Sequence, residues 1–250
     1  MKHILAIFIC TSATFFSYAQ NTLFLKEGTI EFEKKLNMFK QFETDNWWGE
    51  QFADYYKKNM PQFKTSYFNL YFNGDKTLYK PGKENPENEK MRGWGNVAEE
   101  NIVFTDFTTD NRVAQKSVFD ATFLISDSTR KINWKITDET REIAGFQCRR
   151  ANALIMDSVY IIAFYTDAIL TPGGPESVSG LPGMILGLAV PNKHVTWFAT
   201  KVTTEAIPYA QLMPPKEGKK VNNKMVLTTL KDAFKDWGKW GTKYVEQLMF

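Results

Sequence analysis

Short apolar segments separated by turn residues recur from Ile102 to Val202, and no long helical pattern interrupts them. Short strands at such regular spacing are typical of an antiparallel sheet, a sandwich or an open barrel. A parallel α/β fold would need a helix between successive strands. We therefore expect a mainly β fold, a strongly curved antiparallel sheet that forms an open half-barrel or a sandwich. The expected strands are 102–107, 113–119, 119–126, 131–136, 143–155, 158–165, 184–190 and 195–202.

The N-terminal half adds a strand, a helix and a hairpin. Polar and apolar residues alternate over 29–33, which predicts a half-buried strand. Aromatic residues recur at helical spacing over 46–58, with Asp45 as the expected N-cap and Pro61 as the stop. Apolar alternation on both sides of 73–75 (Asn-Gly-Asp) predicts a hairpin.

The remaining segments predict a loop, a linker and a C-terminal helix. Residues 81–95 are rich in Gly, Pro, Asn and Glu and predict a surface loop. Residues 203–225 are expected to form a linker. Apolar residues at helical spacing then predict a helix over 226–250, with Gly238 and Gly241 as points of interruption.

The first residues have the pattern of a secretory signal peptide. A basic start precedes the apolar run Ile4–Cys10, and Ser17-Tyr18-Ala19 satisfies the small-x-small cleavage rule. We expect cleavage before Gln20, which leaves a single β-rich domain over 20–250. The apolar run is too short to span a bilayer, and no later segment is long enough. The sequence thus predicts export to the periplasm or the outer-membrane surface, with no transmembrane span.

A glycine- and proline-rich stretch precedes the apolar strand Met184–Val190. Glycine permits positive φ and proline fixes φ, so the stretch predicts a shaped turn. Two interpretations stay open, a structural turn and a loop that contacts a ligand or a partner. A phosphate loop is not indicated, because no Lys-Ser/Thr pair follows the glycines. The candidate binding residues are Gly174, Pro175, Gly180, Leu181, Pro182, Gly183, Met184 and Ile185.

This stretch also resembles the signature of the GLPGLI family. Residues 180–185 read Gly-Leu-Pro-Gly-Met-Ile. Two further segments precede them in the family's order: Trp134-Lys135-Ile136, and residues 143–151, which include Gly145 and Cys148. Met184 stands where the signature has Leu, a change that preserves volume and apolarity. The resemblance implies an exported protein of a Bacteroidota-type bacterium, with no established activity. It also implies association with a TonB-dependent outer-membrane receptor, since members are often encoded near such receptors.

No catalytic, metal or cofactor site emerges from the residue types. His194 is expected to be a solvated turn residue, and one Cys and one His in unrelated segments make no zinc site. Asp106, Asp110 and Asp120 lack the order of a calcium loop. The acidic pairs Glu99-Glu100 and Asp138-Glu139 are expected to be solvated, because strand neighbours point to opposite faces.

Cys148 is the one cysteine that remains after cleavage, so no internal disulfide is expected. It is either a buried small residue, a reactive thiol or an intermolecular partner.

These patterns lead to three functional hypotheses. The first is a non-catalytic binding or accessory protein of the cell envelope that works with a TonB-dependent receptor. The second is a periplasmic carrier of an apolar, lipid-like ligand in a half-barrel cavity. A hydrolase is a remote third. The formal net charge of +3 with interspersed signs argues against a nucleic-acid partner.

Overall fold

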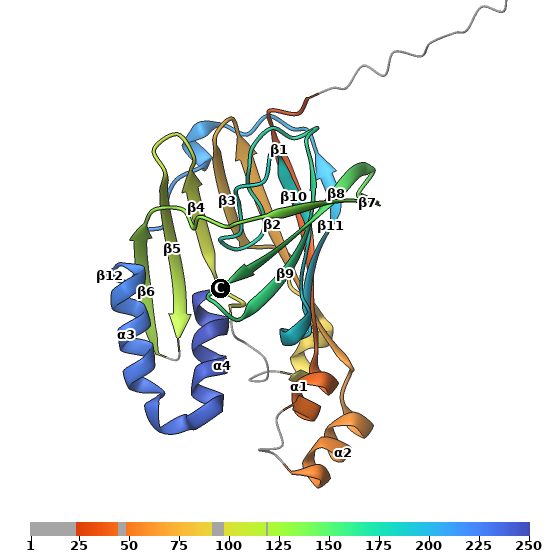
Figure 1. The fold of residues 1–250 in the computed structure, drawn as a ribbon, viewed down its shortest axis with the longest axis vertical. Helices are drawn as coiled ribbons and strands as arrows, with labels where there is room; N and C mark the ends of the chain where they lie inside the picture. The colour runs from red at the N-terminus through yellow and green to blue at the C-terminus, as the bar shows by residue number, and fades with distance from the viewer. Residues whose placement is uncertain (1–23, 45–48, 92–97, 119) are drawn as a thin grey trace, which may run out of the picture.

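The computed structural model describes residues 24–44, 49–91, 98–118 and 120–250. In this part of the chain, twelve strands form one sheet in the order β12-β6-β5-β4-β3-β2-β1-β11-β10-β9-β8-β7. The sheet is strongly curved and its two end strands do not pair, so it stays open (Figure 1). The predicted mainly β fold is confirmed. The predicted signal peptide and the Asp45 cap lie outside the described residues.

The strands are β1 Glu27–Asn37, β2 Phe63–Asn73, β3 Lys76–Pro81, β4 Ile102–Asp106, β5 Asn111–Val118, β6 Ala121–Asp127, β7 Lys135–Ile143, β8 Phe146–Ile155, β9 Val159–Thr166, β10 Met184–Val190, β11 Val195–Thr203 and β12 Lys219–Val221. The helices are α1 Met38–Thr44, α2 Glu50–Asn59, α3 Asn223–Ala233 and α4 Gly238–Met249, with short 3-10 turns η2 Pro86–Met91, η3 Pro191–Lys193, η4 Tyr209–Gln211 and η5 Lys235–Trp237. Among the described residues, no helix has both the length and the apolar character needed to cross a membrane.

The central strands β1 and β2 show why the sheet has a buried inner face. They pair from Glu27↔Asn73 to Asn37↔Phe63, and buried residues alternate with partly exposed ones along both. Because side chains alternate across a strand, the buried set lines one face. Apolar residues fill most of it, namely Ile30, Phe32, Phe68, Leu70 and Phe72. The Asn-Gly-Asp hairpin forms as predicted between β2 and β3, with Gly74 at φ 56°.

The segment between β9 and β10 folds back into the inner side of the sheet. We call residues 173–183 the glycine loop. Backbone hydrogen bonds close it, from Ile185 N to Gly173 O at 2.9 Å and from Gly180 N to Pro172 O at 3.1 Å. The Trp134 indole N–H also donates to Ser179 O at 3.1 Å. The loop is therefore pinned at both ends and packs as part of the interior.

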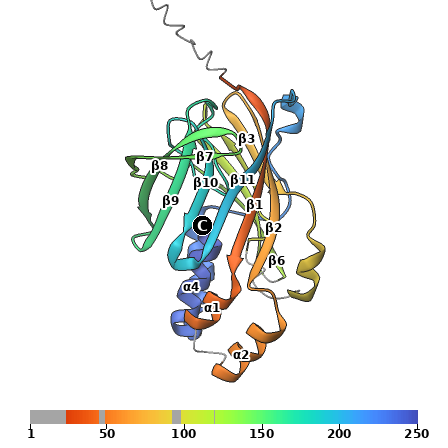
Figure 2. The same ribbon diagram turned by 90° about the vertical axis from the view of Figure 1, so that its right-hand side faces the viewer.

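The C-terminal helices bind the sheet together at one end. Figure 1 shows α3 and α4 side by side, with the chain end inside the bend of the sheet, and Figure 2 shows α4 and the chain end from the side. Glu246 of α4 accepts hydrogen bonds from Lys193, between β10 and β11, and from Ser158, between β8 and β9. Lys116 of β5 donates to Leu248 O at 3.1 Å. One helix thus joins strands from both halves of the sheet.

Several boundaries differ from the sequence predictions. The predicted C-terminal helix is two helices, because the chain turns through η5 and Gly238 adopts a positive φ of 56°. The predicted linker carries η4 and β12, and the loop 81–95 carries η2. Strand β7 spans Lys135–Ile143 instead of 131–136, since this largely exposed edge strand shows little alternation. Helix α1 was not predicted.

Two glycines of the loop test how much its shape contributes to stability. A Cβ on Gly183, at φ +139°, would lie 2.1 Å from Thr166 O, whereas one on Gly180, at φ +92°, would meet nothing closer than 3.8 Å. We expect Gly183→Ala to lower the free energy of unfolding by about 3 kcal/mol, through a backbone clash and an unfavourable φ. Gly180→Ala, the matched control, should cost about 1 kcal/mol from φ alone. Urea unfolding of both variants measures the difference, and equal losses would contradict this account.

Candidate functional site

Three lysines point to the inner face of the sheet. Lys34, Lys64 and Lys116 follow the same alternation that buries the apolar residues of β1, β2 and β5, and each is about 5% exposed or less. A buried ammonium group is costly unless it is paired or hydrogen-bonded. The partners of these lysines therefore define the candidate site.

Glu99 supplies the partner of Lys34. Its carboxylate lies 2.9 Å from Lys34 Nζ, and the Glu99 side chain is only 18% exposed. Burial alone would raise the pKa of Glu99, but the charges of Lys34 and Lys64 and hydrogen bonds from Ser66 and Lys34 outweigh it and hold the pKa below its ordinary value. The expectation that Glu99 is solvated is wrong, because the loop before β4 turns it inward. Its neighbour Glu100 is exposed, as expected.

Glu176 enters the interior from the glycine loop. It is buried and adopts φ 56°, a conformation that non-glycine residues rarely adopt. Asn101 Nδ2 donates to its Oε2 at 2.8 Å, while Oε1 has no hydrogen-bond partner among the described residues. The positive φ is unfavourable for this residue, and the buried hydrogen bond from Asn101 helps to hold the carboxylate in place.

Tyr79 and Trp197 lie near Glu176 and are equally enclosed. Burial and the charge of Glu176 raise the pKa of Tyr79 well above its ordinary value, so its hydroxyl stays protonated. The nearby Trp197 indole N–H lowers the pKa of Tyr79, although this N–H and the Tyr79 hydroxyl do not have the geometry of a hydrogen bond. The Tyr79 hydroxyl and the Trp197 N–H both lack a hydrogen-bond partner among the described residues. We call Tyr79, Glu176 and Trp197 the interior triad.

The last turn of α4 and Phe250 contact Trp197 of the interior triad and Ser177 beside Glu176. Lys116 donates to Leu248 O at 3.1 Å, and Arg130 donates to Met249 O at 2.6 Å. Ser177, next to Glu176, donates to Phe250 O at 2.6 Å. The Phe250 ring stacks on Trp197, with centroids 5.5 Å apart and an interplanar angle of 12°.

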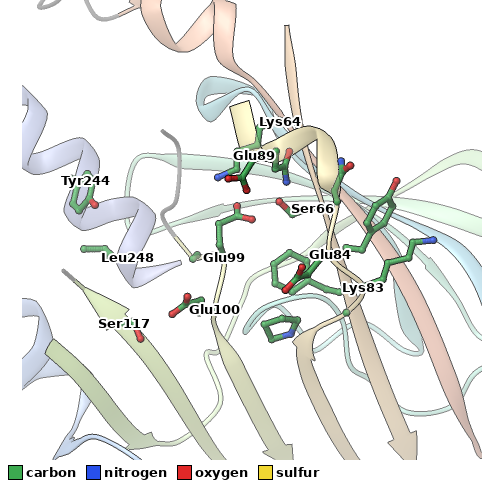
Figure 3. Close-up of a pocket in the computed structure, with 17 residues that line it drawn as sticks. Lys64, Ser66, Lys83, Glu84, Glu89, Glu99, Glu100, Ser117, Tyr244 and Leu248 are labelled. Atoms are coloured by element: carbon green, nitrogen blue, oxygen red, sulfur yellow. The ribbon is translucent and has the colours of Figure 1, made fainter. Parts of the chain in front are cut away.

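An open pocket lies beside α4. It has a volume of about 670 Å³, and Tyr244 and Leu248 of α4 form one wall. Figure 3 shows Glu99 and Lys64 facing the opening from across it. The charged lining side chains among the described residues are the acids Glu84, Glu89, Glu99 and Glu100 and the bases Lys64 and Lys83. We call this cavity the outer pocket; its walls combine an excess of acids with the aromatic rings of Tyr67, Phe68 and Tyr244.

The structure places six of the eight predicted binding residues in the core. Leu181, Met184 and Ile185 are at most 2% exposed, and a Cβ on Gly174 would meet Val178 O and Ile185. Pro175 and Gly183 are buried as well, whereas Gly180 and Pro182 are exposed. Their burial favours the structural-turn interpretation, and their binding role stays a prediction. The loop contributes to the site through Glu176 and Ser177.

The other candidate side chains have structural partners. Cys148 is buried, and burial raises the pKa of its thiol to about 12, so the thiol stays protonated. Asp110 accepts hydrogen bonds from Thr129 and Lys131, and Asp106 pairs with Lys76. Among the described residues, no cluster of three or more His, Cys, Asp or Glu side chains has the arrangement to hold a metal ion.

Sequence reasoning missed most residues of this site. Lys34, Lys64 and Lys116 carry a signal, because each continues an alternating strand on its buried face. Glu99, Glu176 and Phe250 lie in loops or at a chain end, where no periodicity shows which side chains turn inward.

Comparisons with known proteins bear on the fold. No family model matches the chain, and no curated protein is significantly similar, so the GLPGLI resemblance stays a prediction. Two solved structures of PNGF-II, in different crystal forms, are similar with TM-scores of 0.52 and 0.51 and identities of 17% and 16%. The matches cover 83% and 85% of this chain but only 32% and 33% of PNGF-II, so the chain spans about a third of that protein's length.

A third solved structure is an uncharacterized conserved protein from Thermus thermophilus, with a TM-score of 0.37 and 6% identity over 77% of this chain and 90% of that one. At these identities, the PNGF-II likeness shows a shared fold.

The buried Lys116 predicts a rise in stability at alkaline pH. Burial lowers its pKa from 10.5 to about 8, although Glu176 opposes part of the shift. Below about pH 8 both the folded and the unfolded chain carry the proton, and the cost of burying the charge is fully present. Between about pH 8 and 10.5 the unfolded chain binds more protons, so stability rises with pH.

Lys116→Met removes this titration. We expect the unfolding free energy of the wild type, relative to Lys116→Met, to increase by about 2 kcal/mol between pH 8 and 10. Urea unfolding at several pH values measures this difference. A constant difference across that range would show that Lys116 is not buried as a cation.

Proposed function

We propose that the protein is an exported binding protein of the cell envelope, and that it holds a small polar ligand in the outer pocket. The observation that carries the proposal is the pocket, a cavity of about 670 Å³ at the open end of the sheet. A volume of this size is typical of small-molecule sites. The rigid sheet on one side and α4 on the other support the pocket walls.

The charges of the outer pocket indicate which ligand it would take. Among the described residues, four carboxylates and two ammonium groups line it, and the charge of Glu99 is offset by Lys34 and Lys64. Glu84, Glu89 and Glu100 then stand against Lys83, whose ammonium group lies 4.5 Å from the centroid of the Tyr67 ring. An excess of carboxylates beside aromatic rings favours a ligand that carries a positively charged group. The same charges disfavour the lipid-like ligand considered from the sequence, because an apolar molecule would leave them desolvated.

The cellular role is proposed from the sequence alone. The signal-peptide pattern supports export, and the GLPGLI resemblance supports work beside a TonB-dependent outer-membrane receptor. In this role the protein would hold the ligand on the path to or from such a receptor.

Purification from the native envelope tests the proposal directly. The tagged mature protein would be isolated in mild detergent and analysed by native mass spectrometry. We expect a non-covalent mass of a small cationic molecule on the protein, with or without a co-purified receptor. A protein without bound mass, and without binding in a thermal-shift screen of small amines, would overturn the ligand proposal.

A charge-reversal pair locates the ligand. Glu84→Lys together with Glu100→Lys reverses two charges of the outer pocket, and we expect it to weaken binding of the identified ligand by about tenfold or more. Glu205→Lys together with Glu217→Lys makes the same change in net charge at exposed residues outside the pocket and is the matched control. Equal weakening by both pairs would place the ligand elsewhere.

A further inference from the structure

The charged side chains of the outer pocket are sorted by depth. Lys64 lies on the buried face of β2 and is 5% exposed, and the Glu99 side chain is 18% exposed. These two form the charged part of the inner wall. The charged residues at the rim are all exposed and are Glu84, Glu89, Glu100 and Lys83.

The inner wall has a net positive charge. Glu99 lies 2.9 Å from Lys34 Nζ, and the charge of Lys64 acts on the same carboxylate. One carboxylate is thus shared by two buried ammonium groups. Burial lowers the pKa of Lys64, and the charge of Lys34 adds to this shift, while Glu99 opposes it without cancelling it. A further anion beside Lys64 would favour its charged form.

The rim has the opposite balance among the described residues. Glu84 and Glu100 are exposed acids of two different segments, before η2 and before β4. The one base of this group, Lys83, has its ammonium group 4.5 Å from the centroid of the Tyr67 ring. Figure 3 shows the Lys83 side chain extending away from Glu100. The rim is therefore suited to a cation.

The size and the remaining walls of the pocket limit what can join these two regions. Phe68, Tyr244 and Leu248 line the pocket with rings and an aliphatic side chain. A sphere of 670 Å³ is about 11 Å across, and three residues of extended chain span about 10 Å. A single α-amino acid carries both charged groups on one carbon atom, whereas a short peptide separates them.

We propose that the ligand of the outer pocket is a short peptide with free amino and carboxyl ends. Its carboxylate pairs with Lys64 at the inner wall, and its ammonium group lies between Glu84 and Glu100 at the rim. An apolar side chain of the peptide packs against Tyr244 and Leu248. This inference rests on the proposed function, in which the pocket binds a cationic group, and it adds the second charge and the ligand class.

Three forms of one tripeptide test the inference on the full mature chain. The probes are Ala-Leu-Ala with both ends free, its C-terminal amide, which keeps only the cation, and its N-acetyl form, which keeps only the anion. Isothermal titration calorimetry measures each dissociation constant. We expect the free tripeptide to bind about tenfold more tightly than either blocked form, because each blocked end loses one charge-assisted contact.

Two sets of variants assign the ends of the peptide. Lys64→Gln should weaken the free tripeptide about tenfold and leave the amide within about twofold of its wild-type affinity. Lys201→Gln makes the same change in net charge at a side chain that is 63% exposed and outside the pocket, and it should change neither. Glu84→Lys with Glu100→Lys should weaken the free tripeptide and the amide by similar factors.

The outcomes separate this inference from the proposed function. An amide that binds as tightly as the free tripeptide, or small amines that bind while no tripeptide form does, would overturn the peptide inference and leave the cation site standing. Equal weakening of the free tripeptide and the amide by Lys64→Gln would also overturn it. If Lys64→Gln does not fold by circular dichroism, the three forms on the wild type still decide. Failure of small amines and of every tripeptide form would overturn both.

Discussion

Burial of charge inside a curved β-sheet is the constraint around which this molecule is built. Lys34, Lys64 and Lys116 lie on strands whose alternation directs them inward, where an unpaired ammonium group is unfavourable. Each needs a partner from outside its own strand. Glu99 comes from the loop before β4, and the Leu248 carbonyl comes from α4. The loops and the C-terminal helix therefore stabilise the sheet through polar contacts as well as through apolar packing.

The same constraint explains the architecture of the open end. An open sheet of this curvature leaves a concave side that must be filled, and here apolar side chains fill only part of it. The glycine loop and the end of α4 fill the rest, and they bring Glu176, Ser177 and Phe250 next to Trp197. The outer pocket stays open, with acids and aromatic rings in its walls.

Likeness of fold and likeness of site are separate matters for this chain. The likeness to about a third of PNGF-II, at 17% identity, shows a shared fold alone. Folds of this kind host unrelated functions, and function resides in the residues placed on them. For that reason the functional argument rests on the buried charges and the outer pocket.

The regular spacing of short apolar segments was sufficient to predict the mainly β class. Apolar alternation around Asn-Gly-Asp predicted the β2–β3 hairpin, and the apolar run after the glycine- and proline-rich stretch predicted strand β10 at its observed bounds. The alternation along β1, β2 and β5 also indicates that Lys34, Lys64 and Lys116 point inward. Local sequence patterns could not predict three features of the site. Glu99 turns inward, Glu176 is buried at a positive φ, and the Phe250 ring stacks on Trp197. They join residues between about 50 and 80 positions apart, and such contacts arise only when the sheet curves and brings its loops to a common centre.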